Sequence, residues 1–231
     1  MDKKNHKVQA IVEEIRNCKN SFGKSESPCY VEKYDQKWPD YSKLINATPL
    51  VADWRDQKVL LISQAPSKQA MRDGVLNELS NTFLKEKLLK KLFPESKSSE
   101  EAYKVWYRNV FWCHTANCYP GKAKGGDRLP NLYCAKRFLN RLINAIEPQL
   151  ILLMSWAATK PFAKEITTHY GLNGRTYPSL TDILRKQKES KNLLEINGAE
   201  CIVIPHLAPW DGKGEINKHA VKRVREILLK L

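Results

Sequence analysis

The pattern of hydrophobic and polar residues divides the chain into short apolar runs separated by longer amphipathic stretches. A short apolar run followed by turn-forming residues is typical of a strand that is buried on both faces. The last apolar stretch resembles an edge hairpin, or a strand followed by a core strand that ends at Pro205. The predicted strands cover residues 58–63, 109–114, 150–154 and 193–204.

The amphipathic stretches repeat apolar residues at helical spacing, as Val8, Ile11, Val12 and Ile15 do near the N-terminus. Strands that alternate with helices typically form a parallel sheet with helices on both faces. We therefore predict one α/β domain over residues 1–231, a three-layer α/β/α sandwich around a central, mainly parallel four-stranded sheet. The predicted helices cover residues 5–17, 80–93, 99–106, 132–147, 180–188 and 215–230, and another begins at Trp156.

Two stretches lack either pattern. Residues 18–54 mix proline, glycine, serine and aromatic residues, and residues 119–131 are rich in glycine, proline and lysine. A structureless loop as long as the first stretch is uncommon inside a compact domain unless something anchors it. Cys18 and Cys29 lie within it, so metal ligation is one way in which it could be anchored.

Three predicted strands end in polar, turn-forming loops, at residues 63–66, 113–117 and 206–209. The carboxyl ends of parallel strands meet at one edge of a sheet, and ligands of such sheets bind beyond that edge. The sequence therefore predicts one binding site built from these three loops.

Composition adds a charge argument, because 39 Lys and Arg against 25 Asp and Glu give a net charge of +14. Such an excess favours a polyanionic partner such as nucleic acid, although a lysine-rich protein without such a partner is the alternative. No apolar run reaches the roughly 18 residues of a membrane helix, and the polar N-terminus lacks a signal-peptide core. We expect an intracellular protein, cytoplasmic and associated with the nucleoid.

Six cysteines in a reducing compartment argue against a disulfide framework. They stand at positions 18, 29, 113, 118, 134 and 201, and no two form a Cys-x-x-Cys pair. Any metal must therefore be held by cysteines that are distant in sequence. Cys113 and Cys201 adjoin strand residues, which indicates buried small side chains rather than ligands.

The strand-end loops and one cysteine pair carry a set of motifs. The first loop reads Ser-Gln-Ala-Pro-Ser over residues 63–67, and the last reads His-Leu-Ala-Pro over residues 206–209. Cys118 and Cys134 enclose 15 residues, in a segment that reads Cys-Tyr-Pro-Gly-Lys-Ala-Lys-Gly-Gly-Asp at its start. With these motifs in this order, residues 8–230 resemble the uracil-DNA glycosylase superfamily, in particular its iron–sulfur branch, called family 4.

The resemblance implies a monofunctional DNA-repair enzyme of base excision repair. It would flip uracil out of single- or double-stranded DNA and hydrolyse the glycosidic bond, leaving an abasic site. We expect it to act as a monomer on uracil-containing DNA. A non-catalytic iron–sulfur protein that binds DNA is the alternative from another class.

The resemblance also implies a [4Fe–4S] cluster on four thiolates, ligands that suit iron–sulfur clusters. The ligands would be Cys18, Cys29, Cys118 and Cys134. Ten residues separate Cys18 from Cys29, where the family usually has Cys-x-x-Cys. The alternative is that these two are ordinary residues and no cluster forms.

For the chemical step, the resemblance assigns His206 as the donor to uracil O2, where negative charge develops as the bond breaks. Leu207 would wedge into the duplex as the nucleotide leaves the stack. Gln64 stands where family 4 has Glu, and it can orient a water but cannot act as a base. Glu78 aligns with an Asp of related subgroups, and Asp73 is the other nearby carboxylate. Glu78 is otherwise a solvated acid at the start of a helix.

The same resemblance places Gln64, Ala65 and Pro66 against the base. His114 stands where relatives have an Asn that reads the uracil edge. Since a histidine can donate or accept, recognition of uracil could be retained, or altered towards hypoxanthine or xanthine.

A stacking ring is also expected for a flipped base. The family's Phe corresponds to about Leu76, which leaves Tyr119 or Trp112 as candidates. Contacts with DNA would come from basic residues on a glycine-rich loop and from the last strand-end loop, with solvated loops as the alternative. The residues concerned are Lys122, Lys124, Arg128, Leu207, Ala208 and Pro209.

Overall fold

The computed structural model describes residues 3–18, 48–123, 126–127, 132–172, 174, 176–207 and 215–230. Its centre is a five-stranded sheet in the order β2-β1-β5-β7-β6. The first four strands run parallel, and β6 pairs antiparallel with β7. The strands are β1 (Val59–Ser63), β2 (Val110–His114), β5 (Leu150–Met154), β6 (Leu194–Ile196) and β7 (Ala199–Ile204).

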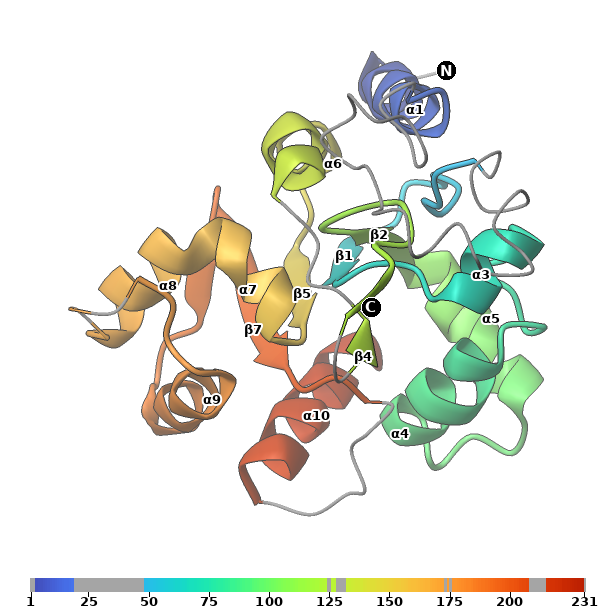
Figure 1. Ribbon diagram of the computed structural model, residues 1–231. Helices are drawn as coiled ribbons and strands as arrows, with labels where there is room; N and C mark the ends of the chain where they lie inside the picture. The colour runs from blue at the N-terminus through green and yellow to red at the C-terminus, as the bar shows by residue number, and fades with distance from the viewer. Residues whose placement is uncertain are drawn as a thin grey trace.

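Helices cover both faces of this sheet (Figure 1). Trp112 packs against Trp106 of α5, whereas the preceding Phe111 packs against Trp54, whose Nε1 donates to Asn5 of α1. Because consecutive strand residues point to opposite faces, α5 and α1 lie on opposite sides. The helices are α1 (Lys3–Arg16), α3 (Lys68–Asp73), α4 (Lys90–Leu92), α5 (Ser99–Asn109), α6 (Asn140–Ile146), α7 (Trp156–Thr159), α8 (Ala163–Tyr170), α9 (Leu180–Glu189) and α10 (Glu215–Leu228).

Two helices begin with π-helical turns, and one helical segment has a 3₁₀ turn. The π turn η2 (Leu84–Leu89) runs into α4, and the π turn η3 (Ala135–Leu139) runs into α6. The 3₁₀ turn η4 (Lys160–Phe162) joins α7 to α8. Among the described residues, no helix combines the length and the apolar character needed to cross a membrane.

The predicted three-layer α/β fold with a mainly parallel sheet is confirmed. The four predicted apolar segments supply all five strands, because the edge hairpin contributes both β6 and β7. The sequence prediction missed α3, a six-residue helix held by its caps. Ser67 Oγ accepts from Ala70 N at its start, and Gly74 closes it in the left-handed conformation that glycine adopts at low cost.

The two irregular stretches are described in part. Residues 48–54 lie along the outer edge of β2 without forming a strand: Leu50 N donates to Asn117 O and Ala52 N donates to Trp112 O. The glycine-rich stretch holds two short antiparallel strands, β3 (Lys122–Ala123) and β4 (Gly126–Asp127). The edge of the sheet beyond β2 is thus covered by chain rather than left open.

Helix α1 is tied to η3 and α6 by one carboxylate. Glu14 accepts from Arg141 at 2.7 Å and from Arg137 at 2.8 Å. These hydrogen bonds, first from Arg141 and then from Arg137, lower the pKa of Glu14 below its ordinary value of 4.5. A carboxylate with a lowered pKa stabilises the fold above its ordinary pKa, and that stabilisation is lost as the pH falls through the folded-state pKa.

We predict that Glu14→Gln lowers the free energy of unfolding at pH 7 by about 0.5–1 kcal/mol, the scale of a partly exposed ion-pair network. The difference from the wild type should shrink as the pH falls below 4.5. Denaturant unfolding at pH 7 and pH 3 measures both values, with Glu13→Gln on the exposed side of α1 as the control. A difference that stays constant with pH would contradict this role of Glu14.

Candidate active site at the carboxyl ends of the strands

The loops that follow β1 and β2 are bonded to each other. Ser63 and His114 are paired in the parallel register, each as the last residue of its strand. Beyond them, Thr115 N donates to Ser63 O at 2.8 Å and Ala116 N donates to Gln64 O at 3.3 Å. The Thr115 hydroxyl also donates to Gln64 O. Hydrogen bonds therefore join two of the three predicted loops.

A hydrogen-bonded group of three side chains, the Ser63 unit, lies at the ends of these two strands. Trp112 Nε1 donates to Ser63 Oγ at 2.9 Å, and Ser63 Oγ lies 2.6 Å from His114 Nδ1. An indole N–H can only donate, so Ser63 Oγ accepts from Trp112. We assign its own proton to His114 Nδ1, the arrangement in which the serine hydroxyl both accepts and donates. In this assignment the second ring nitrogen of His114 carries a proton.

Burial keeps His114 neutral and leaves its second nitrogen unmatched. The residue is 1% exposed, and its burial lowers the pKa of His114 to about 3. Its Nε2 is buried and has no hydrogen-bond partner among the described residues. An unmatched buried donor costs about 1–3 kcal/mol, and such groups in folded proteins call for an explanation. A ligand acceptor, such as a carbonyl oxygen, would satisfy it.

A row of rings leads from His114 to the loop that follows β7. Trp112 lies 5.7 Å from His114 and 6.1 Å from Phe83, between ring centroids. Phe83 stacks on His206, with centroids 5.3 Å apart and planes inclined by 26°. The third predicted loop therefore meets the other two through Phe83, at the start of η2. The sequence interpretation did not single out Phe83; its signal was an aromatic residue at the start of a helix.

The tip of β5 joins the same edge through Ser155. Its backbone has φ 90° and ψ 164°, a conformation that a residue other than glycine rarely adopts. Ser155 N donates to Ile204 O at the end of β7. Its hydroxyl oxygen is buried and has no partner among the described residues. Backbone strain of this kind is typical of functional sites.

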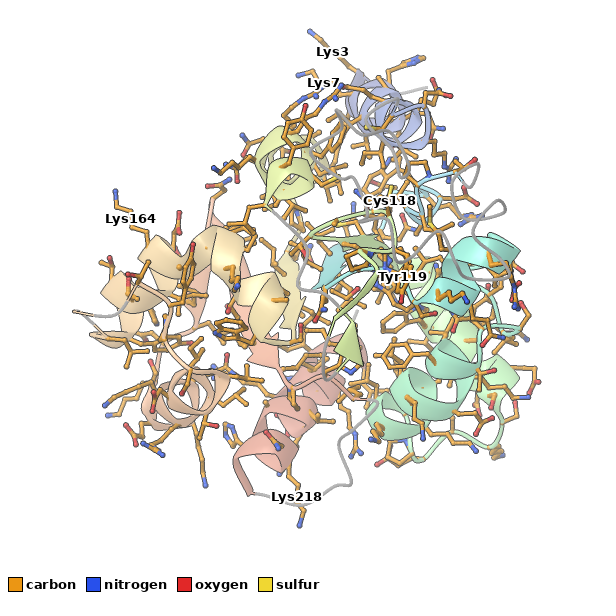
Figure 2. All side chains as sticks on the ribbon, viewed as in Figure 1. Lys3, Lys7, Cys118, Tyr119, Lys164 and Lys218 are labelled. Atoms are coloured by element: carbon orange, nitrogen blue, oxygen red, sulfur yellow. The ribbon has the colours of Figure 1, made fainter. Side chains whose placement is uncertain are left out.

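The predicted first-loop residues lie at the tip of β1. Gln64 and Ala65 are half-buried, Pro66 is buried, and the loop passes directly into α3. Tyr119, one of the two predicted stacking rings, is 1% exposed. Figure 2 shows it close to the centre of the molecule, with Cys118 nearby. Of the two predicted rings, Trp112 is the one that lies in the row between His114 and Phe83.

The two predicted carboxylates lie on α3 and on the turn after it. Asp73 ends α3 and pairs with Arg72 at 2.7 Å. Glu78 is exposed, accepts from Ser80 Oγ at 3.3 Å and lines a pocket beside β2. Gln64, Glu78 and Asp73 were predicted to orient or activate the attacking water. Of these three residues, Gln64 is the one that directly follows a central strand.

Three of the four predicted cluster ligands are described: Cys18 after α1, Cys118 after β2 and Cys134 before η3. The fourth, Cys29, lies outside the described residues. Among the residues that are described, no three His, Cys, Asp or Glu side chains gather as a metal site. The predicted set of four thus stays a prediction. As expected, Cys113 and Cys201 are fully buried within strands.

Most of the predicted DNA contacts also lie outside the described residues. Lys124, Arg128, Ala208 and Pro209 belong to that group, and only the backbone of Lys122 is described, in β3. The described contact, Leu207, is fully buried in the core, and its carbonyl accepts from Lys91 Nζ at 2.6 Å. To wedge into a duplex, Leu207 would have to leave the core. Figure 2 labels Lys3 and Lys7 together on α1, and Lys164 and Lys218 at two other edges of the molecule.

We predict that stability declines as the pH falls below 6.5, in part because of His114. The unfolded chain takes up a proton near the ordinary pKa of 6.5, whereas folded His114 stays neutral down to about pH 3. The unfolded state therefore binds more protons in this window, so stability rises with pH there. His114→Asn should flatten this part of the unfolding free energy curve, and His6→Asn on the exposed side of α1 should not. If the wild type and both variants show equal slopes of unfolding free energy against pH, folding does not lower the pKa of His114.

The described tips of the parallel strands bring two histidines to the two ends of one row of aromatic rings, and one of them, His114, has a buried Nε2 without a partner among the described residues. Such a site can stack a planar ring and donate hydrogen bonds to its carbonyl oxygens. No protein-family model and no curated protein sequence matches this chain. The residues themselves therefore carry the functional argument.

Proposed function

We propose that the chain is a monofunctional uracil-DNA glycosylase, similar to the iron–sulfur branch of that superfamily. The observation that carries the proposal is the buried, unmatched Nε2 of His114, at the end of an aromatic row that leads to His206. A flipped base needs a stacking ring and donors at its carbonyl oxygens. The motifs of the strand-end loops and the net charge of +14 support DNA as the source of that base.

His114 would read the base through one hydrogen bond. Its Nε2–H can donate to a carbonyl oxygen but not to an exocyclic amino group, which offers only donors of its own. Uracil has a carbonyl where cytosine has an amino group, so this contact would favour the deaminated base. The Ser63 unit would hold the ring in the required tautomer, as an orienting partner does for other histidines.

His206 would act on the leaving base. As the glycosidic bond breaks, negative charge develops on the uracil oxygens, and a donor aimed at O2 stabilises it. Phe83 now covers the His206 ring, so the base would enter by stacking on Phe83 or by displacing it. In either case Phe83, together with Trp112, would supply the flat apolar contact for the base.

Water would be positioned from the β1 tip. Gln64 follows Ser63 there, and its amide can orient a water although it cannot remove the proton. Glu78 and Asp73 are the carboxylates that could take the proton, and both belong to the segment that begins with α3. Assays of Gln64→Ala, Glu78→Gln and Asp73→Asn in parallel would rank the three.

A single-stranded oligonucleotide with one uracil tests the proposal. The wild type should release uracil and leave an alkali-labile site. His206→Ala should slow single-turnover release by roughly 100- to 1,000-fold, the usual effect of losing a donor to a developing oxyanion. His6→Ala, an exposed histidine on α1, is the matched control and should keep the full rate. If the wild type at stoichiometric concentration releases no uracil from single strands or from U·A or U·G pairs, the proposal fails.

One observation favours a second candidate, a glycosylase for hypoxanthine or xanthine. An Asn could donate to a carbonyl oxygen and also accept from the neighbouring ring nitrogen. His114 offers a single donor, so it would bond the carbonyl oxygen and leave that ring nitrogen without a hydrogen bond. Hypoxanthine and xanthine carry a carbonyl where adenine has its amino group. The same assay with these bases separates the two candidates.

We further propose a [4Fe–4S] cluster on Cys18, Cys29, Cys118 and Cys134. Their thiolates would supply the usual number of soft ligands, and ligation would tie the segment between α1 and residue 48 to the loop that follows β2. Protein purified without oxygen should contain about four iron atoms per chain. Cys134→Ala should lose most of this iron, and Cys201→Ala, a buried cysteine in β7, should retain it. Wild-type protein with no iron or sulfide and with all four thiols free to react would rule the cluster out.

A further inference from the structure

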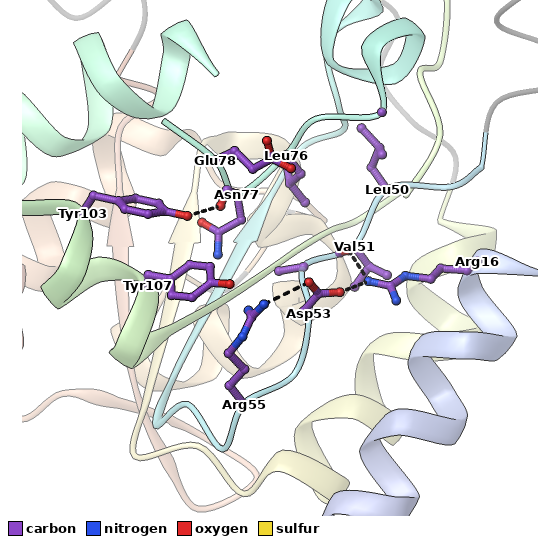
Figure 3. Close-up of a pocket in the computed structure, with 12 residues that line it drawn as sticks. Arg16, Leu50, Val51, Asp53, Arg55, Leu76, Asn77, Glu78, Tyr103 and Tyr107 are labelled. Carbon is purple, nitrogen blue, oxygen red and sulfur yellow. Dashed lines mark hydrogen bonds and ion pairs between the residues drawn. The ribbon is translucent and has the colours of Figure 1, made fainter. Parts of the chain in front are cut away.

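A pocket lies at the edge of the sheet beyond β2, away from the strand-end site, and we refer to it as the edge pocket (Figure 3). It has a volume of about 330 Å³, within the range of small-molecule sites, roughly 300–1,000 Å³. One wall is the turn after α3 with Asn77 and Glu78. Tyr103 and Tyr107 of α5 form the wall beside it, and Arg55 lies below them in the view.

Asn77 offers an unmatched donor in this pocket. Trp106 Nε1 donates to its Oδ1 at 2.8 Å, and the Tyr103 hydroxyl donates to its backbone carbonyl at 2.9 Å. Because an indole N–H can only donate, the amide cannot be turned round, and Nδ2 must face the other way. Asn77 is 8% exposed, and Nδ2 is buried with no partner among the described residues. Figure 3 shows this nitrogen pointing towards Tyr107 and Arg55.

Arg55 presents a flat surface on the other side. Its guanidinium lies over the Tyr107 ring, 4.1 Å from the centroid, and donates to Asp53 at 3.1 Å. Arg16 also donates to Asp53, at 2.6 Å, and this bond in particular holds the pKa of Asp53 below its ordinary value. Held at two points, the planar guanidinium is available for stacking.

The charges in the edge pocket balance. Arg16 and Arg55 carry two positive charges, and Asp53 and Glu78 carry two negative charges. A phosphate or another anion would need an excess of positive charge. The lining therefore suits an uncharged ligand that is flat, has an acceptor for Asn77 and has a donor for Glu78.

We propose that the edge pocket binds a nucleobase, either free or at the end of a single strand. The base would stack on Arg55, as bases do on guanidinium planes, accept from Asn77 Nδ2 through a carbonyl or ring nitrogen, and donate to Glu78. Trp106 connects this site to the active-site candidate, because it donates to Asn77 and packs edge-on against Trp112, 6.3 Å away. The proposal does not depend on glycosylase activity.

Nuclear magnetic resonance titration with uracil, adenine, thymidine, adenosine and a short single strand without uracil tests it. Binding should shift the side-chain amide of Asn77 and the indole N–H of Trp106. Shifts with the free bases or nucleosides support a free ligand, and shifts with the oligonucleotide alone support a strand-borne base. If none of these probes shifts either resonance, the proposal is overturned.

Two variants confirm the location. Arg55→Lys keeps the charge next to Asp53 but removes the flat surface, and it should weaken binding by roughly 2- to 30-fold. Arg185→Lys, beside Asp182 on α9, is the matched control. Asn77→Asp keeps an acceptor for Trp106 and removes the donor, and it should weaken binding about tenfold. Unchanged backbone amide resonances outside the edge pocket in the free variants show that the fold is intact. Binding that neither variant weakens would place the ligand elsewhere.

Discussion

The Ser63 hydroxyl is the contact on which the candidate site depends. It is the last residue of β1, it accepts from Trp112 of β2, and it holds the imidazole of His114 at the end of the same strand. Without it, two buried polar groups would lose their partner, at about 1–3 kcal/mol for each group left unmatched. One small side chain therefore sets the orientation of the tryptophan, the tautomer of the histidine and the direction in which the free N–H points.

This arrangement explains why a neutral histidine suits the proposed chemistry. The apolar surroundings that lower the pKa of His114 to about 3 also exclude water from its N–H. A hydrogen bond in such surroundings is stronger than one in water, and the Ser63 unit already holds the imidazole in one orientation. His206 lies at the other end of the aromatic row, on a separate strand tip. Separate donors for the two sides of a base are consistent with recognition by one and stabilisation of charge by the other.

Much of the fold could be predicted from the sequence, since each core strand is a short apolar run and burial favours such runs in parallel sheets. The meeting of three loops could also be predicted, because parallel strands share an edge.

Helix α3 was missed because two caps, Ser67 and Gly74, define it rather than a hydrophobic repeat. The Ser63 unit could not be found by motif, since it depends on the register that sets Ser63 against His114. The position of Phe83 depends equally on its tertiary contact with Trp112 of β2. Glu78 was predicted from alignment with relatives. The side of the turn on which Glu78 lies depends on how its neighbour Asn77 packs against Trp106.

The tautomer and charge of His114 test this account most directly, and both can be read from the nitrogen shifts of the imidazole in protein labelled with ¹⁵N. The account predicts a neutral ring from pH 8 to pH 4, as burial lowers the pKa of His114 to about 3. It also predicts that the proton is on Nε2 and that Nδ1 accepts from Ser63. A proton on Nδ1, or titration near the ordinary pKa of 6.5, would contradict it.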